Sequence, residues 1–318
     1  MHGRLFQFDL TEGLVMPFPS YFVLLLTGFL LATVMGAVWA RRVGQNPDVI
    51  VDLGLAMVLA GIVGGRLLHV FADGQFWDYV HLCTDPSKVV WPVTRQQCLS
   101  PEYAGTWDFA QKVCRAKETD CFAWAKFYAG GLAYYGGFGT ASAAAWYLLK
   151  VDRFPFWKAA DMAGMVVPLG LGFGRLGCLL AGCCFGKPWS SSWAVTFPAG
   201  SPASEAEHRL GLLKTTMTES LPVHPTQIYE SLASFAIAAF LILHLHGRKR
   251  YDGQIFLTFV GLYAALRFLI EFVRADDRGS LFGLSTSQLV GALLLGGAYY
   301  LHRKRSERVA RALGAVAA

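Results

Sequence analysis

The 318-residue sequence contains few charged residues. Asp, Glu, Lys and Arg together make up 16% of the chain, whereas a soluble domain carries about 25%. Hydrophobic residues make up 54%. A composition with so little charge and so much apolar surface argues against a soluble globular domain and favours a chain that lies in a membrane.

No cleavable signal peptide, low-complexity tract or long internal repeat is evident in the sequence. The residues before Tyr21 include Asp9 and Glu12 in place of the basic region that begins a signal peptide. We therefore expect the first apolar segment to be retained as a membrane helix.

Long apolar runs are what the chain has instead. Each run is roughly 17–22 residues long, which suffices for a helix to cross about 30 Å of hydrocarbon. The runs cover approximately residues 21–40, 49–70, 128–149, 159–180, 227–246, 255–273 and 285–301. They predict an all-α, polytopic membrane protein with seven transmembrane helices, which forms a single integral membrane domain over residues 1–318.

The basic residues predict the orientation of these helices. A net charge of +6 is compatible with nucleic-acid binding, but the charges lie in alternate short loops and in the C-terminal tail. This distribution is typical of cytoplasmic loops, so we expect an outer N-terminus, a cytoplasmic C-terminus and no nucleic-acid partner. The residues concerned are Arg41, Arg42, Lys150, Arg153, Lys158, Arg248, Lys249, Arg250, Arg303, Lys304, Arg305, Arg308 and Arg311.

Two longer segments then fall outside the membrane, an extended loop over residues 71–127 and a head segment over residues 182–223. The loop carries an even number of cysteines, which predicts two disulfides in an oxidising compartment and leaves three pairings open. Free thiols and metal ligands are the alternatives, although the spacing matches no zinc pattern. The four residues are Cys83, Cys98, Cys114 and Cys121.

Glycines are frequent in the apolar runs. The stretch "GFGRLG" at residues 172–177 satisfies a dinucleotide-binding pattern, but no strand or βαβ unit surrounds it. Glycines in membrane helices more often allow close packing of backbones, and we interpret "GIVGG" at residues 61–65, Gly170 and Gly174 in this way.

Arginine inside an apolar run costs about 2.5–3.5 kcal/mol on insertion scales. Three such residues lie near the predicted outer boundary, Arg66, Arg175 and Arg267. The spacing of Glu271 and Arg274 from Arg267 predicts one shared helix face. A buried ion pair that only fixes helix packing explains one such pair. Three arginines on three helices favour a shared polar cavity for an anion, and a lipid phosphate fits this description.

The segment "HPTQIYE" opens the fifth apolar run with a proline suited to the first helical position. His224, Gln227 and Ser231 share a helix face, and Tyr229 and Glu230 flank it. An interfacial belt accounts for the tyrosine but not for a His, a Gln and a Glu together.

The segment "AGGLAYYGGFG" at residues 129–139 has paired glycines on both sides of two tyrosines. Irregular backbone at this depth is tolerated only where it lines a cavity or is buried in protein. An aromatic anchor with packing glycines is the alternative interpretation.

The motifs "GGRLLHV", "GRLGCLLAGCCFG", "HPTQIYE" and "LRFLIEFVR" occur in this order on the second, fourth, fifth and sixth runs. Together they resemble the prolipoprotein diacylglyceryl transferases of bacterial inner membranes, over roughly residues 20–300. The resemblance implies a multi-pass inner-membrane enzyme with a periplasmic N-terminus. It would transfer the diacylglyceryl group of phosphatidylglycerol to the lipobox cysteine of a preprolipoprotein, with formation of a thioether and release of glycerol phosphate. The implied partners are that lipid, the lipobox signal peptide and the bilayer; no cofactor and no metal are expected.

The resemblance also assigns roles to residues. Arg175 and Arg267 match the arginines that hold the lipid phosphate, and Glu271 matches the acid that accompanies the second. Tyr135 and His224 are the candidate groups for proton transfer from the attacking thiol. The candidate substrate contacts are Arg66, Cys178, Gly186, Gln227, Tyr229 and Glu230.

The chain departs from the family pattern at three places. Tyr135 stands where the family has a histidine, and because tyrosine is a poor base at its usual pKa of about 10, we consider His224 the substitute. Cys178 replaces an asparagine, and Cys183, beside Cys184, replaces an acidic residue. The outer loop is longer than expected. The helix-end cysteines are interpreted as small cavity residues, as disulfide partners, or as a redox or metal site.

Two other functions are open at this point. Seven cysteines divided between a loop and a helix end suggest a membrane thiol oxidoreductase that acts through Cys183 and Cys184, although no C-x-x-C pair is present. Tyr135 suggests a non-catalytic binder or transporter of anionic lipid that retains the cavity without the chemistry.

Overall fold

The computed structural model describes residues 4–11, 14–72, 74, 76–91, 93, 95–99, 105–126, 133–275, 280–281 and 283–317. The glycines at 130 and 131, which begin the predicted irregular segment, lie outside these residues. The chain forms two compact units, Met1–Ile50 with Phe154–Ala318, and Val51–Arg153.

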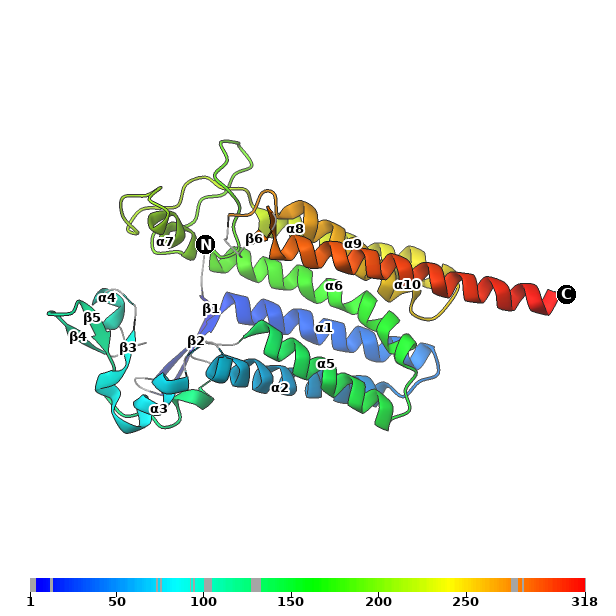
Figure 1. The fold of residues 1–318 in the computed structure, drawn as a ribbon, viewed down its shortest axis with the longest axis horizontal. Helices are drawn as coiled ribbons and strands as arrows, with labels where there is room; N and C mark the ends of the chain where they lie inside the picture. The colour runs from blue at the N-terminus through cyan, green and yellow to red at the C-terminus, as the bar shows by residue number, and fades with distance from the viewer. Residues whose placement is uncertain are drawn as a thin grey trace. The chain divides into compact units, whose positions relative to one another are not determined.

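Long helices pack side by side in the first unit (Figure 1). Helix α6 packs against α1, α8 and α9, and α9 also packs against α10. After α8 the chain continues through a π-helical turn, η4, and a 3₁₀ turn, η5. The bounds are α1 Ser20–Arg42, α6 Phe156–Ala181, α8 Thr226–Ala239, η4 Phe240–Leu245, η5 His246–Arg248, α9 Gln254–Ile270 and α10 Thr286–Ala317.

Helix α6 approaches its neighbours closely at two glycines. A methyl group on Gly172 would lie 2.5 Å from the Phe235 ring of α8, and one on Gly164 would lie 2.9 Å from the Cα of Phe256 on α9. The predicted packing glycines Gly170 and Gly174 are not at these two contacts, although the Cα of Gly170 would lie 3.3 Å from a methyl group on Gly28 of α1. A methyl group on Gly170 would meet nothing within 4 Å, and one on Gly174 would meet only a leucine at 3.9 Å.

Asp161 of α6 anchors the first turn of α9. Its fully buried carboxylate accepts hydrogen bonds from the backbone N–H of Ile255 at 2.9 Å and of Phe256 at 3.2 Å, and from Lys249 Nζ at 2.9 Å. Burial alone would lower the pKa of Lys249, but hydrogen bonds from its ammonium group to Asp252 and Asp161 raise it. The carboxylate therefore satisfies free N–H groups at a helix start and fixes α9 against α6.

Smaller elements flank the bundle in this unit. Strands β1 (Arg4–Thr11) and β2 (Leu14–Pro19) form an antiparallel hairpin before α1. Strands β6 (Ser280–Leu281) and β7 (Leu284–Ser285) pair before α10. The segment 182–223 contains α7 (Pro202–Arg209) and a buried apolar cluster of Phe185, Phe197, Ala203 and Val223. The expectation of an all-α chain holds for the apolar runs only, because short strands occur outside them.

The second unit contains α2 (Pro47–Ala72, of which residues 47–50 belong to the first unit) and α5 (Tyr134–Val151), which lie side by side in Figure 1. Their backbones touch at glycine: a methyl group on Gly136 would lie 2.4 Å from the carbonyl oxygen of Gly64. Thr140 Oγ1 donates to the carbonyl of Ala60 at 2.6 Å. The "GIVGG" stretch therefore packs as the sequence predicts.

The outer loop of the second unit is a small disulfide-linked fold. Its three-stranded antiparallel sheet has the order β3–β5–β4. Disulfides join Cys83 to Cys121 and Cys98 to Cys114, which is the nested one of the three pairings open from the sequence. The elements are α3 Phe76–Thr84, η1 Pro86–Lys88, β3 Val90–Trp91, α4 Arg95–Cys98, β4 Thr106–Asp108, β5 Val113–Arg115 and η2 Ala123–Ala125.

Each predicted apolar run contains a helix within the described residues. Within the described residues, four helical stretches are long and apolar enough to cross a membrane. They are Ser20–Arg42, Pro47–Ala72, Phe156–Ala181 and Thr226–Arg248. Helix α9 is a shorter apolar helix. Large apolar side chains such as Leu30, Leu59 and Leu293 face outward, as lipid-facing helices require. Membrane character is confirmed, and the total of seven spans stays a prediction.

Candidate active site

Glu230 of α8 lies at the centre of a buried cluster of charges. The residue is 1% exposed. Arg175 of α6 forms an ion pair with its Oε2 through Nε. Arg267 of α9 donates from Nη1 to Oε1 at 2.5 Å, and Arg274 donates from Nη1 to the same oxygen at 3.2 Å. Three segments that are far apart in the sequence therefore meet at one carboxylate.

The end of α9 supplies two of these arginines and a second acid. Arg267 Nη2 donates to Glu271 Oε2 at 2.9 Å, the pair that the i,i+4 spacing predicts. Helix α9 ends at Ile270, so Arg274 is not on the same helix face as the spacing suggested. A turn carries Arg274 back to Glu230, where it is 4% exposed.

The cluster has an excess of positive charge. Three guanidinium groups face two carboxylates, which leaves one net positive charge when all five groups are ionised. A buried charge without a partner is costly, and a guanidinium offers five N–H donors in a planar fork. An anion that accepts several hydrogen bonds would therefore be stabilised beside these arginines.

Buried polar side chains hold α8 in the position that brings Glu230 to Arg175. Thr226 Oγ1 donates to the carbonyl of Cys184 at 2.7 Å, and Gln227 Nε2 donates to the carbonyl of Cys183 at 2.7 Å. Ser231 Oγ donates to a backbone carbonyl of α6 at 3.0 Å. Thr226 and Gln227 thus bind carbonyls of the turn that follows α6, and Ser231 binds a carbonyl inside α6. The residues of this buried polar face are Thr226, Gln227, Glu230, Ser231 and Ser234.

Gly186 lies where the segments that follow α6 and α9 meet the start of α8. Its N–H donates to the carbonyl of His224 at 3.0 Å. The N–H of Lys187 donates to the carbonyl of Val273 at 2.8 Å. A methyl group on Gly186 would lie 2.5 Å from His224 Cβ and 2.8 Å from the Val273 oxygen. Only glycine fits here without displacing the backbone that carries Arg274.

His224 lies two residues before the start of α8 and is half-buried. Its ring stacks on Trp189, with centroids 4.2 Å apart and an interplanar angle of 9°, and its centroid lies 6.4 Å from that of Tyr229. Its buried Nδ1 has no hydrogen-bond partner among the described residues. The imidazole is thus held in place while one nitrogen is left without a protein partner.

Three cysteines lie together at the end of α6. The Sγ atoms of Cys178, Cys183 and Cys184 are all within 4.8 Å of one another, and none of the three is in a disulfide. Hydrogen bonds from Cys178 and Cys183 lower the pKa of Cys184, and Arg274 acts in the same direction. Hydrogen bonds to Cys178 and Cys184 raise the pKa of Cys183. The three thiols therefore interact with one another, and Cys184 also interacts with Arg274.

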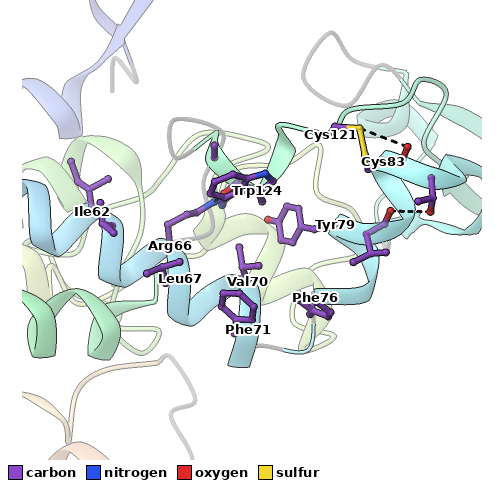
Figure 2. A pocket seen from close by; sticks show the side chains of 14 residues that line it. Ile62, Arg66, Leu67, Val70, Phe71, Phe76, Tyr79, Cys83, Cys121 and Trp124 are labelled. Atoms are coloured by element: carbon purple, nitrogen blue, oxygen red, sulfur yellow. Dashed lines mark hydrogen bonds between the residues drawn. A yellow bond between two sulfur atoms is a disulfide. The ribbon is translucent and has the colours of Figure 1, made fainter.

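Arg66 belongs to the second unit and binds the end of its outer loop. It is buried, and it donates from Nε to the carbonyl of Trp124 at 2.6 Å and from Nη2 to that of Ala123 at 2.7 Å. Its guanidinium also lies 5.2 Å from the ring centroid of Tyr79. It lines a mainly apolar pocket of about 680 Å³ together with residues of α2, α3 and the loop, and Figure 2 shows these side chains.

Tyr135 also belongs to the second unit. It is 78% exposed, and the contact that the structure gives it is with the ring of Tyr134, at 5.6 Å between centroids. The structure thus brings together Arg175, Arg267, Glu271 and Glu230 from the predicted set. Tyr135 and Arg66 belong to the second unit, and their roles stay predictions.

Arg274 is the residue whose importance the sequence did not reveal. It lies seven residues after Arg267 in "RFLIEFVR", a spacing that placed it near the cluster without indicating a contact with Glu230. The sequence gives no clear signal for the end of α9, because no glycine or proline closely follows Ile270.

The chain matches the family model described as prolipoprotein diacylglyceryl transferase over residues 13–302. This match covers most of its length. The chain belongs to this family. Membership agrees with the apolar helices and identifies the chain as an integral bacterial membrane protein.

Relatives of the chain carry the same description. The chain is 29% identical over 287 residues to phosphatidylglycerol–prolipoprotein diacylglyceryl transferase 2 of Clostridium perfringens, with 89% of each chain covered. It is 28% identical to the corresponding enzyme of Corynebacterium diphtheriae, with 91% of this chain and 90% of the relative covered. A shorter match to the enzyme of Vibrio vulnificus is 35% identical and covers 54% of this chain and 59% of the relative.

Proposed function

We propose that this family member transfers the diacylglyceryl group of phosphatidylglycerol to the lipobox cysteine of a preprolipoprotein, and that the Glu230 cluster binds the lipid phosphate. The observation that carries this proposal is the convergence of Arg175, Arg267 and Arg274 on one buried carboxylate. Family membership supplies the reaction, and the cluster supplies a place for it.

The reaction changes the charge of the phosphate. The thiol sulfur attacks the carbon of the diacylglyceryl group that is bonded to the phosphate oxygen. A C–S bond forms while the C–O bond breaks, the bonding electrons leave with glycerol phosphate, and the thiol proton goes to a base. The phosphate starts as a diester that carries one negative charge. It leaves as a monoester that carries about 1.5 to 2 negative charges. Cationic donors fixed around the phosphate stabilise this added charge as it develops.

The excess positive charge of the cluster matches this requirement. Arg175 and Arg267 each use part of their donor set on Glu230 and Glu271, and a guanidinium has five donors in all. We assign these two arginines to the phosphate. Arg274, Glu230 and Glu271 position them, because the carboxylates hold the guanidinium groups in a fixed orientation before the lipid arrives.

Four of the remaining candidate contacts, Cys178, Gly186, Gln227 and Tyr229, belong to the first unit. Gln227 and Gly186 fix the backbone beside the cluster, and Cys178 lies one helical turn after Arg175 on α6. We propose that they, with Tyr229, shape the space for the glycerol and the incoming thiol. Arg66, which lies beside an apolar pocket in the second unit, remains a candidate for contact with the substrates.

We assign the base to His224 in preference to Tyr135. His224 has a buried Nδ1 without a partner in the described part of the chain, and histidine exchanges protons near neutral pH. Tyr135 is largely exposed in the other unit. The imidazole would accept the thiol proton as the C–S bond forms.

The orientation in the membrane follows from the basic residues. The arginines and lysines of alternate short loops and of the C-terminal tail support a cytoplasmic C-terminus and a periplasmic N-terminus. This orientation would place the ends of α6 and α9, and with them the cluster, at the periplasmic side of the inner membrane. Lipobox cysteines of exported precursors would reach the cluster from that side.

The test uses purified protein in vesicles that contain phosphatidylglycerol and a lipobox peptide. Wild type should produce diacylglyceryl peptide and an equal amount of glycerol phosphate. Arg175→Ala and Arg267→Ala should each lower the rate by about 100-fold or more, whereas Arg303→Ala, in an exposed pair on α10, should not.

The same proteins are tested in a strain depleted of its own diacylglyceryl transferase. Growth with wild type and failure with Arg175→Ala are expected. A wild type that binds phosphatidylglycerol but forms no thioether would reject the transferase in favour of a lipid binder. Mixed disulfides trapped on Cys183→Ala would instead support a thiol oxidoreductase.

A further inference from the structure

The cysteines at the end of α6 have no part in the chemistry proposed above beyond the contact suggested for Cys178. Cys178, Cys183 and Cys184 are free thiols, whereas the four loop cysteines form two disulfides. No zinc-binding spacing joins the three in the sequence. The fold brings them together, because α6 ends at Ala181 and the chain then turns back.

The backbone of this turn is held by hydrogen bonds. Gly182 caps α6 in the left-handed region at φ 72°, and Cys184 also has a positive φ, of 61°. The N–H of Cys183 donates to the carbonyl of Cys178 at 3.1 Å. Side chains of Thr226 and Gln227 bind the carbonyls of Cys184 and Cys183. The three sulfur atoms are therefore presented by a fixed turn and a helix end.

The spacing of the sulfur atoms suits one bound cation. All three Sγ atoms lie within 4.8 Å of one another. Three thiolates around a metal at about 2.3 Å have their sulfur atoms about 4.0 Å apart when the metal lies in their plane. The observed separations of at most 4.8 Å are close to this spacing.

Two arginines lie close to the three sulfur atoms. Arg274 lies beside the sulfur of Cys184, and Arg175 interacts with Cys178 and Cys184. A metal binds cysteine as the thiolate, and these guanidinium groups would offset part of the negative charge that the bound thiolates bring.

We propose that Cys178, Cys183 and Cys184 form a three-thiolate binding site for one soft cation of the Cu⁺ class. Thiolates select Cu⁺ and Zn²⁺ over harder ions. Zn²⁺ almost always takes four ligands in structural sites, and the grouping of potential ligands in the described residues ends at three. Binding replaces the thiol protons by the metal and releases them to solvent, so no oxidant or reductant is consumed. This inference goes beyond the proposed transferase activity and does not depend on it.

Binding is tested on the purified full-length protein, with Cu⁺ kept reduced by ascorbate under nitrogen as the probe. A chromophoric Cu⁺ chelator provides the competition. Wild type should bind one Cu⁺ per chain, and that single equivalent should protect all three thiols from alkylation, as read by mass spectrometry of peptides. Zn²⁺ should compete with lower affinity.

Matched variants locate the site. Cys178→Ser, Cys183→Ser and Cys184→Ser should each weaken Cu⁺ binding by about tenfold or more and leave the other two thiols open to alkylation. The double variant Cys98→Ser, Cys114→Ser removes a loop disulfide and keeps the cluster, so it should bind Cu⁺ as wild type does. Thermal unfolding shows whether each variant is folded.

The protection experiment on wild type needs no variant and can overturn the proposal alone. Three thiols that remain equally reactive with and without Cu⁺ would do so. A protein mass that is lower by two hydrogen atoms, with one reactive thiol left, would show that two of the cysteines form a disulfide and would reject the metal site. Binding that is lost in the loop double variant and kept in the cluster variants would also reject it.

Discussion

Arg267 Nη1 and Glu230 Oε1 lie 2.5 Å apart, although the two residues are 37 positions apart in the sequence and belong to different helices. The bond joins α8 to α9 inside the first unit, and Arg175 of α6 binds the other oxygen of the same carboxylate. One acidic side chain therefore sets the positions of three guanidinium groups, one from α6 and two from the end of α9, and the first two predictions below depend on this arrangement.

Glu230→Gln should lower the rate of diacylglyceryl transfer by about 100-fold. The amide keeps the size of the side chain but removes the charge that orients Arg175, Arg267 and Arg274. The measurement is product formation from lipobox peptide in vesicles. Glu307→Gln is the control, because Glu307 pairs with arginines on the exposed face of α10. A Glu230→Gln enzyme as active as wild type would falsify the central role of this carboxylate.

Arg274→Lys should lower the transfer rate by about tenfold or more while the protein stays folded. Lysine keeps the positive charge but loses the planar fork that reaches Glu230. Because Arg274 acts through Glu230, we expect Arg267→Lys and Arg274→Lys to be non-additive when combined. The readout is the rate of the single and double variants at saturating lipid. Fully additive losses would show that Arg274 works independently of the cluster.

Gly186→Ala should destabilise the protein by about 1–3 kcal/mol. Its methyl group would lie 2.5 Å from His224 Cβ and 2.8 Å from the Val273 oxygen, so the backbone must move. Gly170→Ala is the matched control, since the added methyl group meets nothing within 4 Å and alanine favours the helix. The unfolding midpoint in detergent should fall for the first variant and stay or rise for the second. Equal midpoints would contradict the packing described at Gly186.

Glu207→Gln should stabilise the head segment at neutral pH. Burial raises the pKa of Glu207 above its ordinary value of 4.5, although the N–H of Leu221 opposes the shift. The carboxylate oxygen Oε1 has no hydrogen-bond partner among the described residues. Because the pKa is higher in the folded state, the stability from this group is present below the unfolded pKa and is lost as pH rises through the folded pKa.

The unfolding midpoints of Glu207→Gln and wild type should therefore differ most at neutral pH. The two midpoints should converge on acidification to about pH 4. The measurement is the unfolding midpoint of both proteins over this pH range. Glu205→Gln, on the same helix but less buried, controls for a general change of surface charge. A difference that stays constant with pH would reject burial as the cause.

The sequence by itself determined the membrane character of the chain and the places of its helices. Apolar runs long enough to cross the hydrocarbon have few alternatives to helix, because every backbone polar group in lipid must be satisfied within its own segment. The spacing of Arg267 and Glu271 predicted their ion pair for a similar reason, since contacts four residues apart depend only on local helix geometry. Family membership followed from the ordered motifs, and the match over residues 13–302 agrees with it.

Tertiary structure alone decided which partners these residues find across helices. The sequence placed Glu230 beside the predicted polar face of α8, but the packing of α6 and α9 around α8 makes it the shared partner of three arginines. The nested disulfides, the turn that returns Arg274 to the cluster and the gathering of Cys178, Cys183 and Cys184 have the same origin. These contacts join residues that are distant along the chain or lie beyond a helix end, so they depend on the packing of the whole unit and no local periodicity encodes them.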